Sequence, residues 1–142
     1  ALAEQVIDCA HARNVKVILN MPPENLAQAD GIHLNSASLR AFEFLVDTVK
    51  PLAGQYLSAA CHNLEELALA QEHQVDFVFL SPVKQTQSHP EAKPLGWKTF
   101  SDWISGINRP VFALGGMHMG DVIKARYSGA QGIAAIRDLW HL

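Results

Sequence analysis

Short apolar runs alternate along this chain with longer segments in which apolar residues recur every three or four positions. The runs are rich in Val, Ile, Leu and Phe, which is typical of strands buried on both faces of a parallel sheet. They predict strands at 15–20, 31–34, 56–61, 77–80, 111–114 and 133–136. The segments between them predict helices at 1–13, 36–49, 63–73, 97–105 and 121–127, and a short helical turn at 24–29. Capping residues support two helices: Ser36 or Ser38 for the second, and Asn63 with Glu66 three positions on for the third.

Strand and helix alternate throughout, which indicates right-handed βαβ units and a parallel sheet. Two architectures fit this order, an open doubly wound sheet and a β/α barrel. No Gly-x-Gly-x-x-Gly follows the first strand, which disfavours the dinucleotide-binding form of the open sheet. Small residues at the strand ends favour the barrel, although a complete barrel has about eight units. We therefore expect a single α/β domain over 1–142, an incomplete TIM-type (β/α)8 barrel made of the last six units.

A long polar loop at 81–96 separates the fourth strand from the next helix. Connectors in α/β units usually have about two to six residues, and greater length is common in binding loops and lids. The loop carries Thr86, Ser88 and His89 between two lysines, a set suited to an anionic or phosphorylated ligand. His89 is the candidate proton donor among them, because imidazole titrates near neutral pH. From residue types alone, an ordinary solvated surface loop explains the segment equally well.

Other polar residues follow the carboxyl ends of further strands, and in a parallel barrel these ends share one rim. Asn20 ends the first strand, and Gly115 and Gly116 end the fifth, just before a helix. Such a glycine pair lets backbone N–H groups approach a phosphate closely. Arg137, just past the sixth strand, could add a guanidinium to the same anion. A tight turn with positive φ is the alternative role for the glycines, and a surface salt bridge is the alternative for Arg137.

Composition narrows the classes of function. The chain is 49% hydrophobic and 18% charged, which is typical of a globular domain. With a formal net charge of −3 and no basic stripe, it lacks the electrostatic footprint of a nucleic-acid binder. No apolar run approaches the roughly 20 residues that span a bilayer, so we expect no membrane partner and a cytoplasmic location. Cys9 and Cys61 are in no metal-like spacing and are interpreted as free thiols.

Five segments in register resemble a known family, that of thiamine phosphate synthase and its relative, the thiazole tautomerase TenI. These segments are 29–34, 58–65, 75–83, 110–117 and 129–133. The third of them is followed by Thr86 and Ser88. The segments 88–92, 95–97 and 133–140 resemble the branch of the family that is fused behind a Nudix hydrolase. The resemblance implies a β/α barrel that binds a phosphorylated thiazole and, in true synthases, a pyrimidine pyrophosphate with Mg²⁺.

The resemblance also implies roles for individual residues. Thr86 and Ser88 match the two pyrophosphate-binding threonines of the family. Gly116 matches the glycine whose N–H holds the thiazole phosphate, and Asn20 matches an asparagine at a strand lip. The two Mg²⁺-binding aspartates are replaced by Met21 and Ser38, so carboxylate ligands for the metal are missing here. We therefore expect phosphate binding to be retained and leave catalysis open.

Two hypotheses of function follow. The first is a thiamine-phosphate-synthase-like or TenI-like domain that binds a phosphorylated thiazole or pyrimidine; if active, it is a synthase, which uses Mg²⁺, or a tautomerase. The second is a non-catalytic ligand-sensing or structural module attached to an N-terminal Nudix hydrolase domain. The family has a strand, a helix and a strand before the position of Ala1, so we expect the chain to be truncated at its N-terminus. Another chain, for example a second copy in a homo-oligomer, would then cover the edges of the sheet.

Overall fold

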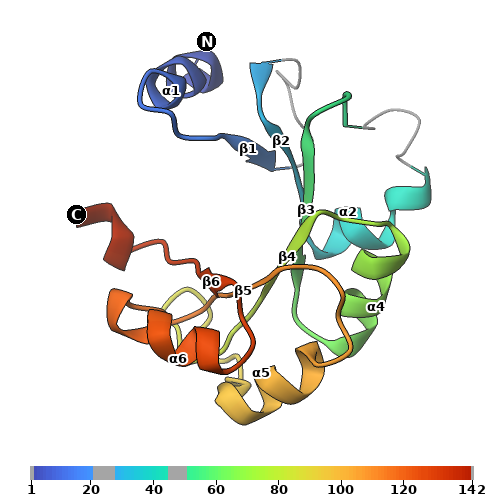
Figure 1. The fold of residues 1–142 in the computed structure, drawn as a ribbon, viewed down its shortest axis with the longest axis vertical. Helices are drawn as coiled ribbons and strands as arrows, with labels where there is room; N and C mark the ends of the chain where they lie inside the picture. Colours follow the sequence, from blue (N-terminus) through green and yellow to red (C-terminus); the bar gives the residue numbers. More distant parts are fainter. Residues whose placement is uncertain (1, 21–27, 45–50, 142) are drawn as a thin grey trace.

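The computed structural model describes residues 2–20, 28–44 and 51–141. Its six strands form one parallel sheet in the order in which they occur along the chain (Figure 1). The strands are β1 (Ile18–Asn20), β2 (Gly31–Leu34), β3 (Tyr56–Cys61), β4 (Phe77–Leu80), β5 (Val111–Ala113) and β6 (Gly132–Ile133). The helices are α1 (Leu2–His11), α2 (Ser36–Arg40), α4 (Leu64–Glu72), α5 (Gly96–Ile104) and α6 (Val122–Tyr127), with 3₁₀ turns η2 (Met119–Asp121) and η3 (Asp138–His141).

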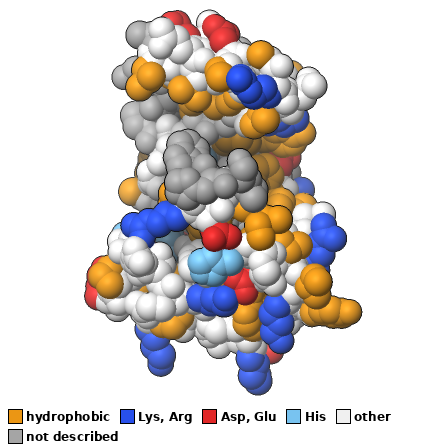
Figure 2. Space-filling model, turned by 90° about the vertical axis from the view of Figure 1, so that its left-hand side faces the viewer, with side chains coloured by type: hydrophobic (Ala, Val, Ile, Leu, Met, Phe, Trp, Pro, Cys, Tyr) orange, Lys and Arg blue, Asp and Glu red, His pale blue; other side chains and the backbone are white. Residues whose placement is uncertain are grey.

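The sheet bends into an arc with α2, α4, α5 and α6 on its outer side (Figure 1). Within the described residues, β1 and β6 each pair with a single strand, so the arc is not closed. Figure 2 shows apolar side chains at the surface on the side of the molecule where the arc is open. The predicted parallel βα alternation is confirmed, and all carboxyl ends of the strands lie at one edge of the sheet.

The two faces of the sheet differ in burial. In β4, Val78 and Leu80 are buried against the helical layer, whereas Phe77 and Phe79 are partly buried on the inner face of the arc. Phe77 and Phe79 pack edge to face, with ring centroids 5.6 Å apart, and both contact the ring of Phe112. In a closed barrel such inward side chains fill the interior. Here they line an accessible aromatic surface.

The limits of β2, β3 and β4 agree with the predicted strands, whereas β1, β5 and β6 are shorter than predicted. β6 begins and ends earlier than the apolar run at 133–136. Ala134 still donates its N–H to Ala113 O at 2.8 Å, and the chain then leads into η3. Most of the predicted turn at 24–29 lies outside the described residues. The end of the predicted helix at 36–49 also lies outside them, from residue 45 on.

The predicted serine caps of α2 are wrong. Asn35 caps this helix, because its side-chain oxygen accepts a hydrogen bond from Ser38 N at 3.0 Å. Both serines lie inside the first turn. The signal was present in the sequence, since asparagine is among the strongest N-cap residues.

The predicted N-cap of α4, Asn63, is confirmed, but the buried Glu66 carboxylate bonds to His62 N and not, as in a capping box, to the N–H of Asn63. Asn63 accepts a hydrogen bond from Glu66 N at 2.8 Å, and Glu66 Oε2 accepts one from His62 N at 2.7 Å. The other carboxylate oxygen, Oε1, lies 3.0 Å from Arg40 Nη2 on α2. Only 3% of the Glu66 side chain is exposed, so this group ties α2 and α4 to the end of β3.

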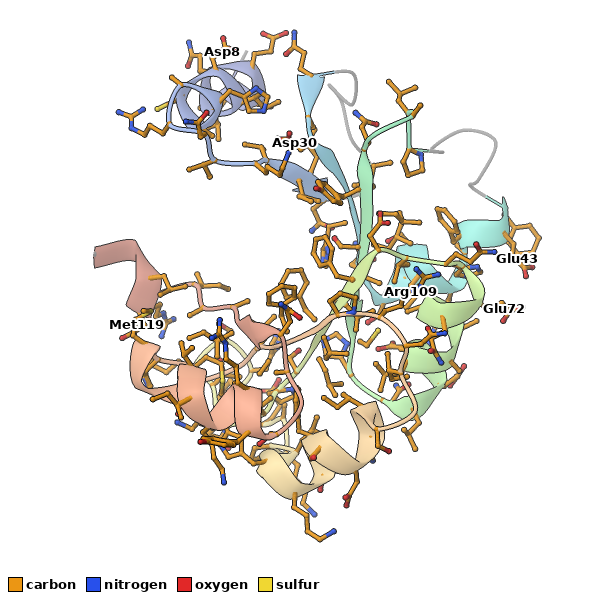
Figure 3. All side chains as sticks on the ribbon, viewed as in Figure 1. Asp8, Asp30, Glu43, Glu72, Arg109 and Met119 are labelled. Carbon is orange, nitrogen blue, oxygen red and sulfur yellow. The ribbon has the colours of Figure 1, made fainter. Side chains whose placement is uncertain are left out.

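At the amino ends of the strands, Asp30 connects α1 to the first two strands (Figure 3). Its carboxylate accepts hydrogen bonds from Val17 N at 2.7 Å, from His11 at 2.9 Å and from Lys16 at 3.4 Å. These donors, the Val17 N–H first, lower the pKa of Asp30 to about 2. No helix among the described residues is long and apolar enough to cross a bilayer.

Candidate functional site

The glycine pair that follows β5 has the positive φ that a tight turn requires, 92° at Gly115 and 64° at Gly116. Both glycines also lie against the loop that follows β4. A Cβ on Gly115 would be 2.7 Å from Pro82 Cα, and one on Gly116 would be 2.4 Å from the carbonyl oxygen of Gln85. Any side chain at either position would displace the loop, so the pair sets how closely the two segments approach.

The first residues of this loop are held to the turn by hydrogen bonds. Val83 N donates to Leu114 O at 2.9 Å, and Lys84 N donates to Gly115 O at 3.1 Å. The Lys84 ammonium lies 2.6 Å from an oxygen of Asp121, just before α6. Burial opposes ionisation of Asp121, but the hydrogen bonds from Lys84 and from the backbone N–H of His118, together with the nearby positive charge, outweigh it and lower the pKa of the carboxyl group. Lys84 therefore anchors the loop.

Between the loop, the turn and the segment after β6 lies a cavity of about 200 Å³, the rim cavity. Its lining consists of Gln85, Thr86, Gln87, Ser88, Leu114, Gly115, Gly116, Met117, His118, Ala135, Ile136, Arg137 and Asp138. Five of the candidate ligand-binding residues, Thr86, Ser88, Gly115, Gly116 and Arg137, thus come together at one place. The hydroxyl and backbone donors and the guanidinium are the groups that bind a phosphate.

Four polar lining residues were missed by the sequence analysis: Gln85, Gln87, His118 and Asp138. Their adjacency to the glycine pair, to the two hydroxyl residues and to Arg137 was the available signal. Arg137 donates a hydrogen bond to the side-chain carbonyl of Gln87, which links the loop to the segment after β6. This contact differs from the surface salt bridge that was the alternative for Arg137.

His118 and Asp138 form a pair at the wall of the rim cavity. His118 Nδ1 lies 3.0 Å from Asp138 Oδ1, and the other carboxylate oxygen accepts a hydrogen bond from Met119 N at 3.0 Å. Figure 3 shows Met119 beside the C-terminal segment that carries this carboxylate. The hydrogen bond from His118, followed by that from Met119 N, lowers the pKa of Asp138, so the carboxylate is ionised at neutral pH.

Two of the candidate residues lie outside the rim cavity. The His89 side chain is 73% exposed and lies 3.9 Å from Glu91 Oε1, and His89 is not among the lining residues. Its catalytic role stays a prediction. Asn20, at the end of β1, lines a second cavity of about 350 Å³ on the inner face of the arc.

This second cavity, the aromatic cavity, is lined by Ile18, Asn20, His33, Ser58, Phe77, Phe79, Leu114, Ala134, Ala135 and Ile136. It shares Leu114, Ala135 and Ile136 with the rim cavity, so the two adjoin. His33 Nδ1 lies 2.9 Å from Ser58 Oγ, and the ring packs edge to face on Phe79. Burial lowers the pKa of His33, which favours the neutral imidazole. The pairing of an aromatic cavity with a polar one suits a ligand that has a ring and an anionic group.

The residues present do not fit a magnesium site at the positions that the family resemblance indicates. Magnesium prefers carboxylate oxygens, but Ser38 offers a hydroxyl that donates to Asn35 O at 3.1 Å. Met21 lies outside the described residues. Within the described part of the chain, no three His, Cys, Asp or Glu side chains converge as metal ligands would.

A curved parallel sheet with a polar cavity at its carboxyl edge is typical of a protein of the β/α-barrel class. Residues 1–139 match the family described as thiamine monophosphate synthase, and the chain belongs to this family. It is 37% identical over 110 residues to a protein of Aquifex aeolicus named "Putative thiamine-phosphate synthase 2", covering 77% of this chain and 56% of that protein. It is 29% identical over 117 residues to the thiamine-phosphate synthase of Haemophilus influenzae, covering 80% and 50% respectively.

The chain therefore spans about half the length of these curated relatives. Among solved structures, it is similar to the thiamine phosphate pyrophosphorylase of Pyrococcus furiosus, with a TM-score of 0.70 at 17% identity over 95% of this chain and 63% of that one. A structure described as native KDPGal matches with a TM-score of 0.57 at 12% identity, over 93% and 61%. Both matches confirm the predicted fold class, an incomplete barrel of the TIM type.

Proposed function

We propose that this chain is a thiamine-phosphate-synthase-like domain that binds a phosphorylated thiazole or pyrimidine precursor in thiamine biosynthesis. The observation that carries the proposal is the convergence of Thr86, Ser88 and Gly116 on the rim cavity. Backbone N–H and hydroxyl groups that line one small cavity are what a phosphate group requires.

The adjoining aromatic cavity supports the same ligand class. A thiazole or pyrimidine ring is flat and apolar on its faces and has nitrogen atoms on its edge. Phe77 and Phe79 offer apolar contact, and the His33–Ser58 pair offers hydrogen-bonding groups beside them. A precursor with its phosphate in the rim cavity and its ring in the aromatic cavity would bind both sets of residues.

Catalysis is the finer part of the proposal. In the synthase reaction the thiazole nitrogen displaces pyrophosphate from the pyrimidine methylene carbon, so donors that hold the departing anion lower the barrier. The Thr86 and Ser88 hydroxyls and the Arg137 guanidinium supply such donors in the rim cavity. The residues at positions 21 and 38, Met and Ser, offer no carboxylate that would hold a metal for this step. His89 would have to move toward the rim cavity to act as a proton donor.

A second candidate, a non-catalytic ligand-sensing or structural module behind an N-terminal Nudix domain, is favoured by Ser38. Its hydroxyl is occupied in the first turn of α2, where a synthase of this family would present a carboxylate. Under either candidate, we propose that preceding chain or a second copy covers the edges of β1 and β6, and that the protein is cytoplasmic.

One assay separates the two candidates. The full-length protein is incubated with the phosphorylated thiazole, the pyrimidine pyrophosphate and Mg²⁺, and thiamine phosphate is measured; calorimetry measures binding of the phosphorylated thiazole separately. Product formation supports a synthase. Binding without product favours the module, and absence of binding of either precursor refutes both thiamine-related candidates.

A further inference from the structure

The charges that line the rim cavity nearly cancel. Arg137 contributes a positive charge and Asp138 a negative one, and the other lining residues, apart from His118, are uncharged. The nearby ammonium of Lys84 is neutralised by Asp121. A phosphate monoester carries a charge of about −1.5 to −2 at neutral pH. The cavity therefore has a net positive charge for such a ligand only when His118 is protonated.

We propose that His118 is a specificity-determining residue of the rim cavity. When protonated it is a cation that binds the phosphate group of the ligand, and when neutral it weakens that binding. The inference rests on the proposed function, since it concerns the same ligand. It adds a residue that the family resemblance does not assign and makes anion binding depend on proton uptake.

The placement of His118 suits this role. Its backbone N–H donates to Asp121 Oδ2 at 2.9 Å, and its Nδ1 lies 3.0 Å from Asp138 Oδ1, so both the main chain and the ring are held. With an Nδ1–H facing the carboxylate, a neutral imidazole would present the lone pair of Nε2 to an anion, which is unfavourable. Protonation converts Nε2 into a charged donor.

The other charged groups around His118 do not change their charge near neutral pH. The carboxylates of Asp138 and Asp121, which face it from η3 and η2, both have lowered pKa values and stay ionised. Lysine and arginine side chains, here Lys84 and Arg137, are cationic throughout this range. Among the charged groups that face the His118 ring, His118 is therefore the one whose protonation changes the charge of the rim cavity.

The test is calorimetric titration of the full-length protein with the phosphorylated thiazole at pH values from about 5.5 to 8.5. Wild type is compared with His118→Gln and with His118→Lys, which keeps a cation at every pH. His11→Gln is the matched control, because His11 also pairs with an aspartate but lies at the opposite edge of the sheet. The second ionisation of the phosphate is common to all four proteins and cancels in affinity ratios.

We expect His118→Gln to bind about tenfold more weakly than wild type at the acidic end and equally at the basic end, the effect of losing one charge-assisted hydrogen bond. His118→Lys should bind about tenfold more tightly than wild type at the basic end. His11→Gln should follow wild type throughout. A constant ratio of wild type to His118→Gln across pH overturns the inference and leaves the proposed function standing, whereas no binding by wild type at any pH overturns both.

Discussion

Gly116→Ala should separate backbone strain from steric contact at the turn that forms the rim cavity. Gly116 has φ of 64°, and its missing Cβ would lie 2.4 Å from Gln85 O and 2.9 Å from Lys84 Cβ. The first of these atoms belongs to the backbone and cannot rotate away. The substitution therefore forces an unfavourable φ on alanine and pushes the loop that carries Thr86 away from the turn.

The expected loss of stability has two parts. Left-handed backbone costs alanine about 1–2 kcal/mol, and displacing packed backbone costs about 1–3 kcal/mol more. The free energy of unfolding should fall by about 2–5 kcal/mol, which lowers Tm by roughly 5–15 °C for a domain of this size. Phosphate binding should weaken as well, because the lining hydroxyls move with the loop.

Two other glycines are the controls in thermal and urea unfolding. Gly54 has φ of 89° and open space around its Cβ position, so Gly54→Ala should lose only about 1–2 kcal/mol. Gly120 has open space and no positive φ, so Gly120→Ala should change stability by less than about 1 kcal/mol. If Gly116→Ala is no less stable than Gly54→Ala, the close packing of loop and turn is not what holds the site together.

Three further predictions concern single side chains. Thr86→Ala should weaken binding of a phosphorylated precursor, the pyrimidine pyrophosphate or the phosphorylated thiazole, about three- to tenfold in calorimetry and leave Tm nearly unchanged; equal affinity for both would return the loop to a plain surface role. Because the pKa of Asp30 is lowered to about 2, its stabilisation is complete above about pH 4 and is lost as pH falls toward 2. Asp30→Asn should therefore cost about 1–2 kcal/mol at pH 7 and little at pH 2 in urea unfolding, and an equal cost at both pH values would contradict the assignment. Glu66→Gln should cost about 1–3 kcal/mol, because it removes the buried carboxylate that accepts from His62 N and pairs with Arg40, whereas exposed Glu65→Gln should be nearly neutral; similar midpoints in urea would count against this role of Glu66.

Local sequence patterns were sufficient for most of the fold. The apolar runs of β2, β3 and β4, which have neighbours on both sides, predicted their limits, and β5 ends one residue earlier than its run. The prediction was least accurate for β1 and β6, the outer strands of the sheet, where pairing on one side alone sustains only three and two residues. Strand length at an edge depends on the neighbour, which the local pattern does not contain.

For the site, the sequence by itself determined which segments carry the chemistry. The glycine pair, the hydroxyls in the loop and Arg137 were recognisable because each follows a strand, and parallel strands end at one edge. Only the tertiary structure decided which of them meet. It added His118 and Asp138 to the rim cavity, and it placed His89 outside and Asn20 in the adjoining aromatic cavity. The physical reason is that a loop's path depends on close contacts between distant segments, such as Gly116 against Gln85, and no local propensity encodes those contacts.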